Sequence, residues 1–322
     1  MCPLGTTLEA LWTGLSRRES GVVRLEETTG HRLAFPFGGQ ARSFTGSIGD
    51  FDLDEAARTK QIRKGLKLMC REIQMGVAAA QFALHHAGLA AGGFDPERTG
   101  VSFGSDHIVA VPDEFVAAYR ACRNGGGSLL HAWGTKGLAE ITPLWLLKYL
   151  PNMPASHIAI YNDLRGPNNS ITQREVSGLL AIAEATATIR RGAADRMLVG
   201  ATGSNLNSMR ALQASFLGEI AYHAPTPELA SRPFDLHRPG MVPGEGAASL
   251  ILEELEVARD RGATIYGEVV RSASSCVARR NGTGDLRGAI RNALSRAALD
   301  LAPHELGHLH AHGLGTLYTD EA

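Results

Sequence analysis

Residues 156–200 read SHIAIYNDLRGPNNSITQREVSGLLAIAEATATIRRGAADRMLVG and alternate short apolar runs with a longer helical pattern. The run at 156–161 has the character of a buried strand, and the turn residues RGPN at 165–168 end it. Helical spacing follows over 176–191, and the apolar run at 197–200 predicts the next strand. Strands that alternate with helices are typical of α/β proteins with a largely parallel sheet. This stretch therefore predicts an α/β fold.

The same alternation extends to both sides of this stretch. On the N-terminal side, helical patterns predict a helix at 6–15 and a long one at 66–89, which is apolar all round at 77–80 and therefore buried. On the C-terminal side we expect strands at 247–252, 265–270 and 309–312 and helices at 253–261 and 286–299. No repeat or low-complexity linker interrupts the pattern, so we expect one continuous unit.

Composition narrows the class of protein. Of 322 residues, 44% are hydrophobic and 20% are charged, which is the balance of a globular protein with a sizeable core. A net charge of −1 gives no overall field that would recruit nucleic acid or an anionic membrane. No apolar run is long enough for a membrane span. The four cysteines form no CxxC pair, which favours a reducing, cytoplasmic setting over a disulfide framework or thiolate metal site.

Three segments together resemble the β-ketoacyl-ACP synthases of the thiolase superfamily. Residues 150–178, LPNMPASHIAIYNDLRGPNNSITQREVSG, are similar to the family pattern LPNMPAxHIxxxxxxRGPNxSIxTACxxG. Residues 231–246, SRPFDLHRPGMVPGEG, are similar to SRPFDxxRDGFVxGEG, and AHGLGT at 311–316 resembles AHGTGT. The order and separation of the segments also fit. The resemblance implies a thiolase-like layered αβαβα fold and a place in fatty acid or polyketide biosynthesis.

The resemblance places Glu175 where the family has its catalytic cysteine. That cysteine takes an acyl group from a carrier-protein thioester at the start of a buried helix, where the helix N-terminus favours the thiolate. A carboxylate is also stabilised there, but its attack on a thioester would give a high-energy mixed anhydride. Glu175 is thus a candidate catalytic residue that we expect not to act as a nucleophile, or simply an acid that stabilises its helix. Gln173 and Arg174 replace small family residues beside it, in the expected acyl pocket.

His312 matches the first of two family histidines that stabilise the enolate oxygen, which suits a fixed imidazole donor. The alternative is a strand-end histidine bonded to the backbone. By the same resemblance, Gly313, Gly315 and Thr316 belong to the substrate-binding loop. The second histidine and the last family segments correspond to nothing before Ala322, so we expect a fold incomplete in its C-terminal half, with residues 1–262 resembling the N-terminal half and 263–322 the start of the second.

Two other motifs suggest a metal site and a docking surface. HELGH at 304–308 satisfies the HExxH pattern of zinc hydrolases, which requires a helix. Pro303 and Gly307 instead predict a loop that enters a strand, so we expect neither a metal site nor another cofactor. The run RTKQIRKGLKLMCR at 58–71 holds six basic residues and no acidic one. It fits either a solvated helix face or, as in the family, a docking surface for acyl carrier protein.

The combined hypothesis is a condensing-enzyme relative, an acyltransferase by resemblance, whose condensation is impaired because Glu175 replaces the cysteine. We expect acyl carrier protein as a partner, and a homodimer or a heterodimer with a Cys-bearing ketosynthase. Two alternatives remain open within the family: a non-catalytic partner subunit and a malonyl-ACP decarboxylase. A zinc hydrolase built on HELGH is the remote third.

Overall fold

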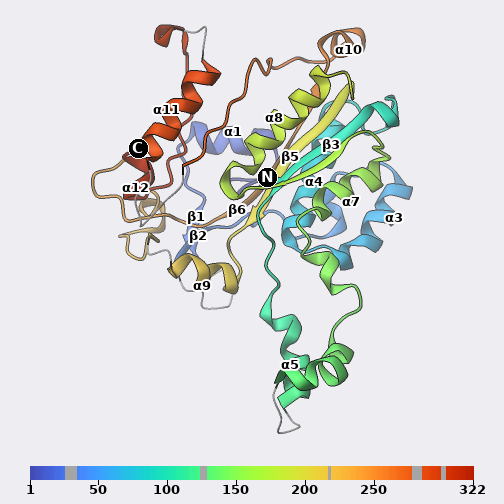
Figure 1. Cartoon of the computed structure of the whole chain (residues 1–322), viewed down its shortest axis with the longest axis vertical. Helices are drawn as coiled ribbons and strands as arrows, with labels where there is room; N and C mark the ends of the chain where they lie inside the picture. Colours follow the sequence, from blue (N-terminus) through green and yellow to red (C-terminus); the bar gives the residue numbers. More distant parts are fainter. Residues whose placement is uncertain (26–34, 124–128, 217–218, 278–284, 299–301) are drawn as a thin grey trace.

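The computed structural model centres on a four-stranded sheet with the strand order β4-β3-β5-β6 (Figure 1). It describes residues 1–25, 35–123, 129–216, 219–277, 285–298 and 302–322. The first half contains α1 (Leu8–Ser16), β1 (Val22–Arg24), β2 (Phe37–Gly39), α3 (Ala56–Gly65), α4 (Arg71–His86), β3 (Thr99–Ser105), α5 (Val116–Arg123), α6 (Leu129–Ala132) and α7 (Met153–Asn162). The second half contains β4 (Asn168–Thr172), α8 (Ser177–Arg190), β5 (Arg196–Ser204), α9 (Ser208–Phe216), β6 (Glu245–Glu253), α10 (Leu255–Asp260), α11 (Leu286–Ala297) and α12 (Leu317–Asp320).

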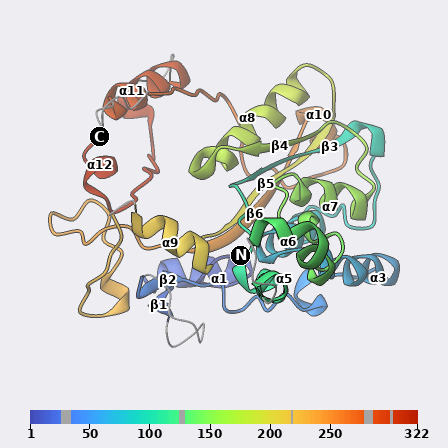
Figure 2. The same cartoon turned by 60° about the horizontal axis from the view of Figure 1, so that its bottom comes forward.

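The sheet is mixed, with helices on both faces. β3 pairs in parallel with β4 and β5, whereas β5 pairs antiparallel with β6, from Arg196 opposite Glu253 to Ser204 opposite Glu245. α4 and α7 pack on one face and α8 on the other, which gives three layers (Figure 2). The prediction of a largely parallel α/β sheet is therefore confirmed, with an antiparallel strand at one edge.

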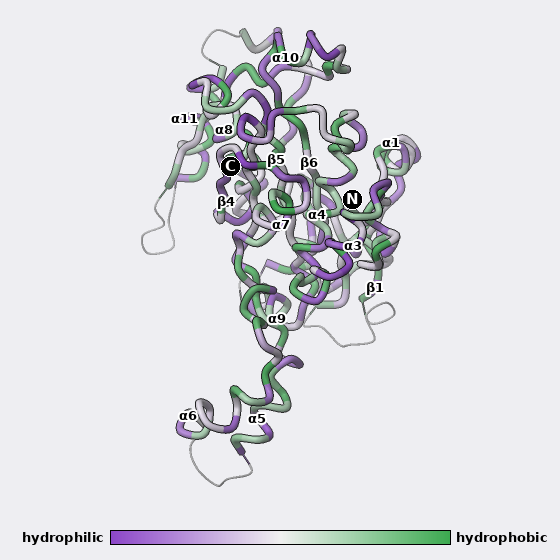
Figure 3. The backbone as a smooth tube through the Cα atoms, turned by 90° about the vertical axis from the view of Figure 1, so that its right-hand side faces the viewer, coloured by the Kyte–Doolittle hydropathy of each residue, from purple (hydrophilic) through white to green (hydrophobic). Residues whose placement is uncertain are grey.

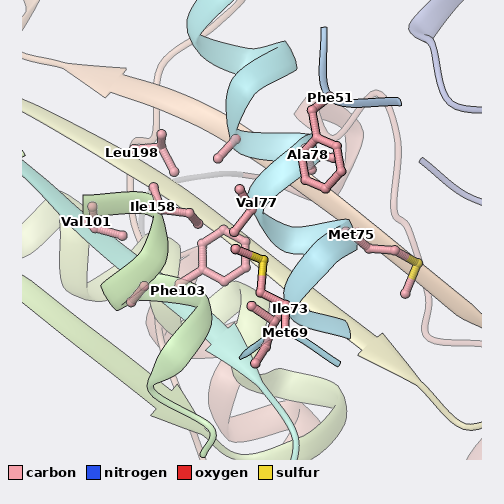
Figure 4. Close-up of a cluster of buried hydrophobic side chains, with 14 of the residues drawn as sticks. Phe51, Met69, Ile73, Met75, Val77, Ala78, Val101, Phe103, Ile158 and Leu198 are labelled. Carbon is pink, nitrogen blue, oxygen red and sulfur yellow. The ribbon is translucent and has the colours of Figure 1, made fainter. Parts of the chain in front are cut away.

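The core lies between the sheet and α4. Val77, Ala78 and Ala80 on α4 are fully buried against Val101, Phe103 and Leu198 of β3 and β5 (Figure 4). Small side chains on α4 allow the helix to lie close to the strands while larger ones such as Phe103 fill the remaining space. The predicted burial all round at 77–80 is confirmed.

The predicted strand at 156–161 is wrong, because these residues belong to helix α7. In a strand Ile158 and Ile160 would share one face, yet Ile158 is fully buried and Ile160 is 67% exposed. Pro154 stands in the first turn of the helix, where its missing N–H costs nothing. The strand of this region is β4, whose polar sequence NNSIT has no apolar alternation because it lies at a sheet edge.

Most of the other predicted helices and strands are confirmed, but one helix is broken and strand β3 was missed. The helices at 6–15, 176–191, 253–261 and 286–299 correspond to α1, α8, α10 and α11 within a few residues, although 299 lies outside the described residues. The strands at 197–200 and 247–252 lie within β5 and β6. The long helix at 66–89 is broken, because Met69 and Cys70 are extended and α4 starts only at Arg71. β3, TGVSFGS, is fully buried but lacked a recognisable strand pattern because of its glycines.

The strands predicted at 265–270 and 309–312 are wrong. Both stretches have no regular structure, and Tyr266 and Leu309 are 80% and 66% exposed. A strand needs a partner for its backbone groups, and neither stretch pairs with a strand of the described sheets. α11 also lies away from the sheet (Figure 1), and α5 with α6 projects from the body of the molecule (Figure 3). The expected division of the chain at residue 262, between regions that resemble the two halves of the family fold, remains a prediction.

One close approach joins α8 to the sheet. A Cβ on Gly104 of β3 would lie 2.6 Å from the carbonyl carbon of Ser177 and 2.8 Å from the amide nitrogen of Gly178. Both are backbone atoms at the start of α8, which can yield only if the helix moves.

We expect Gly104→Ala to lower the free energy of unfolding by about 1–3 kcal/mol, the usual cost of overpacking. Urea denaturation followed by circular dichroism would measure the change.

Gly203 on β5 supplies the control, because a Cβ there meets no atom within 4 Å. Gly203→Ala should leave the urea midpoint unchanged or slightly raised. An equal loss in both variants would show that the approach of α8 to β3 does not decide the effect.

Candidate active site

The turn between β4 and α8 carries Glu175. Residues Arg174–Val176 form one turn of 3₁₀ helix directly before α8, and Arg174 adopts the left-handed conformation with φ 54°. The Ser177 hydroxyl accepts a hydrogen bond from the Gln173 amide at 2.8 Å and donates one to the Ser105 carbonyl at 2.9 Å. These two bonds hold the turn against the carboxyl end of β3.

The Glu175 side chain is 48% exposed, and its Oε1 lies 3.4 Å from Nη2 of Arg174. Because the turn precedes the 14-residue helix α8, the carboxylate stands near the positive end of the helix dipole. The expected location at a helix start is therefore observed. The geometry places an anion and a cation side by side on one short turn.

Arg174 and Glu175 line a pocket of about 720 Å³. Its walls come from the carboxyl ends of β3 and β5, the first turns of α8, the start of β6 and the first turn of α4. Residues at the carboxyl ends of parallel strands commonly form ligand sites in α/β proteins. The charged residues among the lining are Glu72, Asp106, Arg174, Glu175, Arg210 and Glu245.

Glu245 lies at the floor of this pocket, and Arg71 neutralises it. Its side chain is only 1% exposed, and Arg71 binds it with two hydrogen bonds, Nε to Oε2 at 2.8 Å and Nη2 to Oε1 at 2.6 Å. The Ala41 amide and the Ser204 hydroxyl each donate another bond at 3.0 Å. A buried carboxylate needs this number of donors to offset its lost hydration. Glu245 is the middle residue of the GEG motif at 244–246, and its charge is what connects these elements.

Glu72 and Arg210 are charged residues that sequence reasoning missed. Glu72 is 8% exposed in the first turn of α4, and its burial is the main cause that raises the pKa of its carboxyl. The Arg210 guanidinium forms an ion pair with Asp106 at 3.0 Å and donates to the His107 carbonyl, so it holds the segment after β3. An acid five residues before the apolar run at 77–80, within the same expected buried helix, was the one signal that could have marked Glu72.

The remaining predicted residues lie elsewhere. Gln173 and His312 are not among the described residues that line the pocket, and His312 is exposed. Gly313, Gly315 and Thr316 are also outside its lining. Their loop contacts residues 233–241 instead: the Asp320 carboxylate accepts from the amides of Phe234 at 2.9 Å and Gly315 at 3.1 Å. The structure thus brings together Arg174 and Glu175 but not the His312 loop, whose role remains a prediction.

The HELGH segment does not have the geometry of a zinc site. Only Pro303–Glu305 form a short 3₁₀ turn, and 306–312 have no regular structure. The two histidines of the motif therefore do not share a helical face. Within the described ranges, no group of three or more His, Cys, Asp and Glu side chains is placed to hold a metal.

The basic run at 58–71 divides into two parts. Arg58 and Arg71 make structural contacts, Arg58 through hydrogen bonds to the carbonyls of Ala90 and Tyr161. The other basic residues are exposed on α3 and the short turn after it: Lys60, Arg63, Lys64 and Lys67. The docking interpretation can therefore apply only to these four.

Comparison with known proteins identifies the family. A family model described as β-ketoacyl synthase, N-terminal domain, matches residues 1–258. The chain belongs to the β-ketoacyl synthase family. Among curated ketosynthases, the 3-oxoacyl-[acyl-carrier-protein] synthase 2 of Vibrio cholerae is 29% identical over all of this chain and 73% of its own length. The protein of the same name from Synechocystis is 31% identical over 99% of this chain and 71% of its own length.

Solved ketosynthases share the fold. A β-ketoacyl synthase from Burkholderia phymatum superposes with a TM-score of 0.78 and 26% identity, covering 99% of this chain and 73% of that one. A type II PKS ketosynthase, solved with its acyl-carrier protein and bound to the hexaketide, gives a TM-score of 0.74 at 23% identity, over 99% of this chain and 72% of that one. The predicted thiolase-like α/β fold is thereby confirmed. No helix in the described part of this family member is long and apolar enough to span a membrane.

The ion pair at the pocket floor yields a stability prediction. Arg71→Ala would leave Glu245 buried without its cation, so we expect the free energy of unfolding to fall by about 3–5 kcal/mol. Arg165→Ala is the control, because Arg165 pairs with Asp163 and Glu97 at the surface and should cost less than about 1 kcal/mol. Urea denaturation compares the two. Similar costs would contradict a special role for the buried pair.

Proposed function

We propose that this chain receives acyl thioesters of fatty acid or polyketide biosynthesis in the pocket beside Glu175 but does not hold the acyl group covalently. One observation carries the proposal. Glu175 lies on the pocket wall at the start of α8, at the position where the resemblance expects the nucleophilic cysteine. Decarboxylative condensation, which needs the acyl-enzyme, is therefore impaired.

The cysteines offer no substitute. All four lie within the described ranges and none lines the pocket. Cys70 lies two residues before Glu72, which lines the pocket, and burial, with a further contribution from Glu72, raises the pKa of its thiol far above the usual value. A thiol held in its protonated form is a poor nucleophile. Acyl transfer to a cysteine of this chain is thus not supported by the site.

Acyl carrier protein is the proposed donor. The exposed cations Lys60, Arg63, Lys64 and Lys67 form a basic face that complements an acidic carrier. A ketosynthase of the same fold has been solved with its own carrier protein, which supports this class of partner for the present chain.

Restoring a thiol should restore acylation. We expect Glu175→Cys to become labelled by radioactive acyl-ACP as a hydroxylamine-sensitive adduct of up to one acyl group per chain, because the helix start favours the thiolate. The unaltered chain should give no such adduct. Glu184→Cys, at a partly exposed site outside the pocket lining on the same helix, controls for unspecific acylation. Equal labelling of both cysteine variants, or a stable adduct on Glu175 itself, would contradict the proposal.

The basic face can be tested on the same reaction. In the Glu175→Cys background, Lys64→Glu should slow labelling by acyl-ACP about threefold or more at low salt, with the difference shrinking as salt screens the charges. Arg17→Glu, an exposed site at the end of α1, should have little effect. A salt-independent loss, or the same loss for Arg17→Glu, would argue against carrier docking on α3.

A partner subunit is the second candidate. β4 is an edge strand, and its outer edge pairs with no other strand among the described residues. Such an edge is a template for pairing with a second chain, either another copy or a Cys-bearing ketosynthase. Co-purification of a complex that condenses only with the Cys-bearing partner would favour this candidate. A homodimer that decarboxylates malonyl-ACP alone would favour the decarboxylase instead.

A further inference from the structure

The turn Arg174–Val176 combines three features that a thioester-hydrolysing site needs. It presents a carboxylate, a guanidinium 3.4 Å from it, and a pocket of about 720 Å³ in front of both. We infer that this pocket hydrolyses acyl thioesters, with Glu175 as the general base for a water molecule and Arg174 as the stabiliser of the developing oxyanion. The inference rests on the proposed function in one respect, namely that thioesters enter this pocket.

Glu175 suits the role of a base better than that of a nucleophile. A carboxylate that attacks a thioester forms a high-energy anhydride. A carboxylate that takes a proton from water becomes only a neutral carboxylic acid, which is stable. The side chain is 48% exposed on the pocket wall, so water reaches it. The hydrogen bonds of Ser177 to the Gln173 amide and the Ser105 carbonyl hold the turn in place. The base is therefore positioned by the sheet rather than by a free loop.

Arg174 supplies the complementary charge. Its left-handed backbone, φ 54°, is unusual for a residue with a Cβ and places a pocket-lining guanidinium next in sequence to the base. A fixed cation beside the reacting carbonyl stabilises the oxygen that becomes negative in the tetrahedral intermediate. The pair thus provides both elements of general-base hydrolysis on two consecutive residues.

The step balances without another reactant. The water oxygen bonds to the thioester carbonyl carbon while one water proton passes to the Glu175 carboxylate. The tetrahedral oxyanion, held near Arg174, then collapses and the C–S bond breaks. The leaving thiolate takes the proton from Glu175, so the products are a free acid and a thiol, and the carboxylate is regenerated.

An uncharged acyl chain fits this site better than a malonyl group. A malonyl thioester would bring a second carboxylate beside Glu175, and like charges at short distance repel. A saturated acyl thioester avoids this repulsion.

The test uses the full chain with octanoyl-pantetheine, a thioester that can neither decarboxylate nor condense alone. Chromatography would follow the release of octanoate. We expect Glu175→Gln to slow hydrolysis about 100-fold or more, the usual contribution of a general base. Arg174→Gln should lower kcat by about 10-fold or more with a smaller change in KM, because its charge acts mainly on the transition state. Glu184→Gln, on the same helix, should keep the original rate.

Two further measurements, of thermal stability and of ¹⁸O incorporation, separate the general-base mechanism from unfolding and from an anhydride route. The Arg174 and Glu175 variants should melt at the temperature of the unaltered chain, because both side chains are about half exposed. In ¹⁸O-water the label should enter octanoate and not the Glu175 carboxylate, as mass spectrometry of the peptide would show. Label in Glu175 would prove an anhydride route and overturn the general-base assignment. Hydrolysis by the unaltered chain no faster than by Glu175→Gln would overturn the inference.

The labelling of Glu175→Cys by acyl-ACP separates this inference from the proposed function. If that variant is acylated but the unaltered chain does not hydrolyse octanoyl-pantetheine, the pocket receives thioesters and only the hydrolytic inference fails. If neither reaction occurs, the proposed function fails as well.

Discussion

The ion pair between Arg71 and Glu245 is the constraint on which the pocket depends. The two residues are 174 positions apart, and together with the Ala41 amide and the Ser204 hydroxyl they join the start of α4, the start of β6, the end of β5 and the loop after β2. Because the Glu245 carboxylate is almost fully buried, its hydration is replaced by donors from all these elements at once. Loss of any one donor would leave part of that charge uncompensated, so the elements keep a fixed relation around the pocket floor.

The opposite wall depends on contacts of a different kind. Gly104 lets α8 approach β3 closely, and the Ser177 hydroxyl joins the helix start to the end of that strand. The turn with Arg174 and Glu175 lies directly before this contact. The position of the two charges is therefore a consequence of strand and helix packing, and the chemistry proposed for them needs no movement of a loop.

Local patterns predicted the elements whose stability is local or whose burial is uniform. α8 and α11 have helical periodicity, and β5 and β6 are apolar runs, so their sequences identify them. The sequence pattern missed β4 and predicted a strand where α7 lies, because the burial of both elements depends on the elements packed beside them. β4 is polar since it lies at an edge, and α7 mixes buried and exposed isoleucines that resemble an apolar strand when burial is unknown. The stretches at 265–270 and 309–312 have strand-like sequences but no partner strand, which a sequence pattern does not reveal.

For the site, the sequence by itself determined the family, and it predicts that Glu175 stands at the position of the family's cysteine, because both follow from motifs of fixed residues at fixed offsets. It also placed Arg174 beside that glutamate. Only the tertiary structure decided that Glu72 and Arg210 share the pocket, that Arg71 serves Glu245 rather than a docking face, and that the His312 loop contacts residues 233–241 instead. The physical reason is that burial, hydrogen bonds and ion pairs join residues from 86 to 174 positions apart, and no local spacing of side chains contains that information.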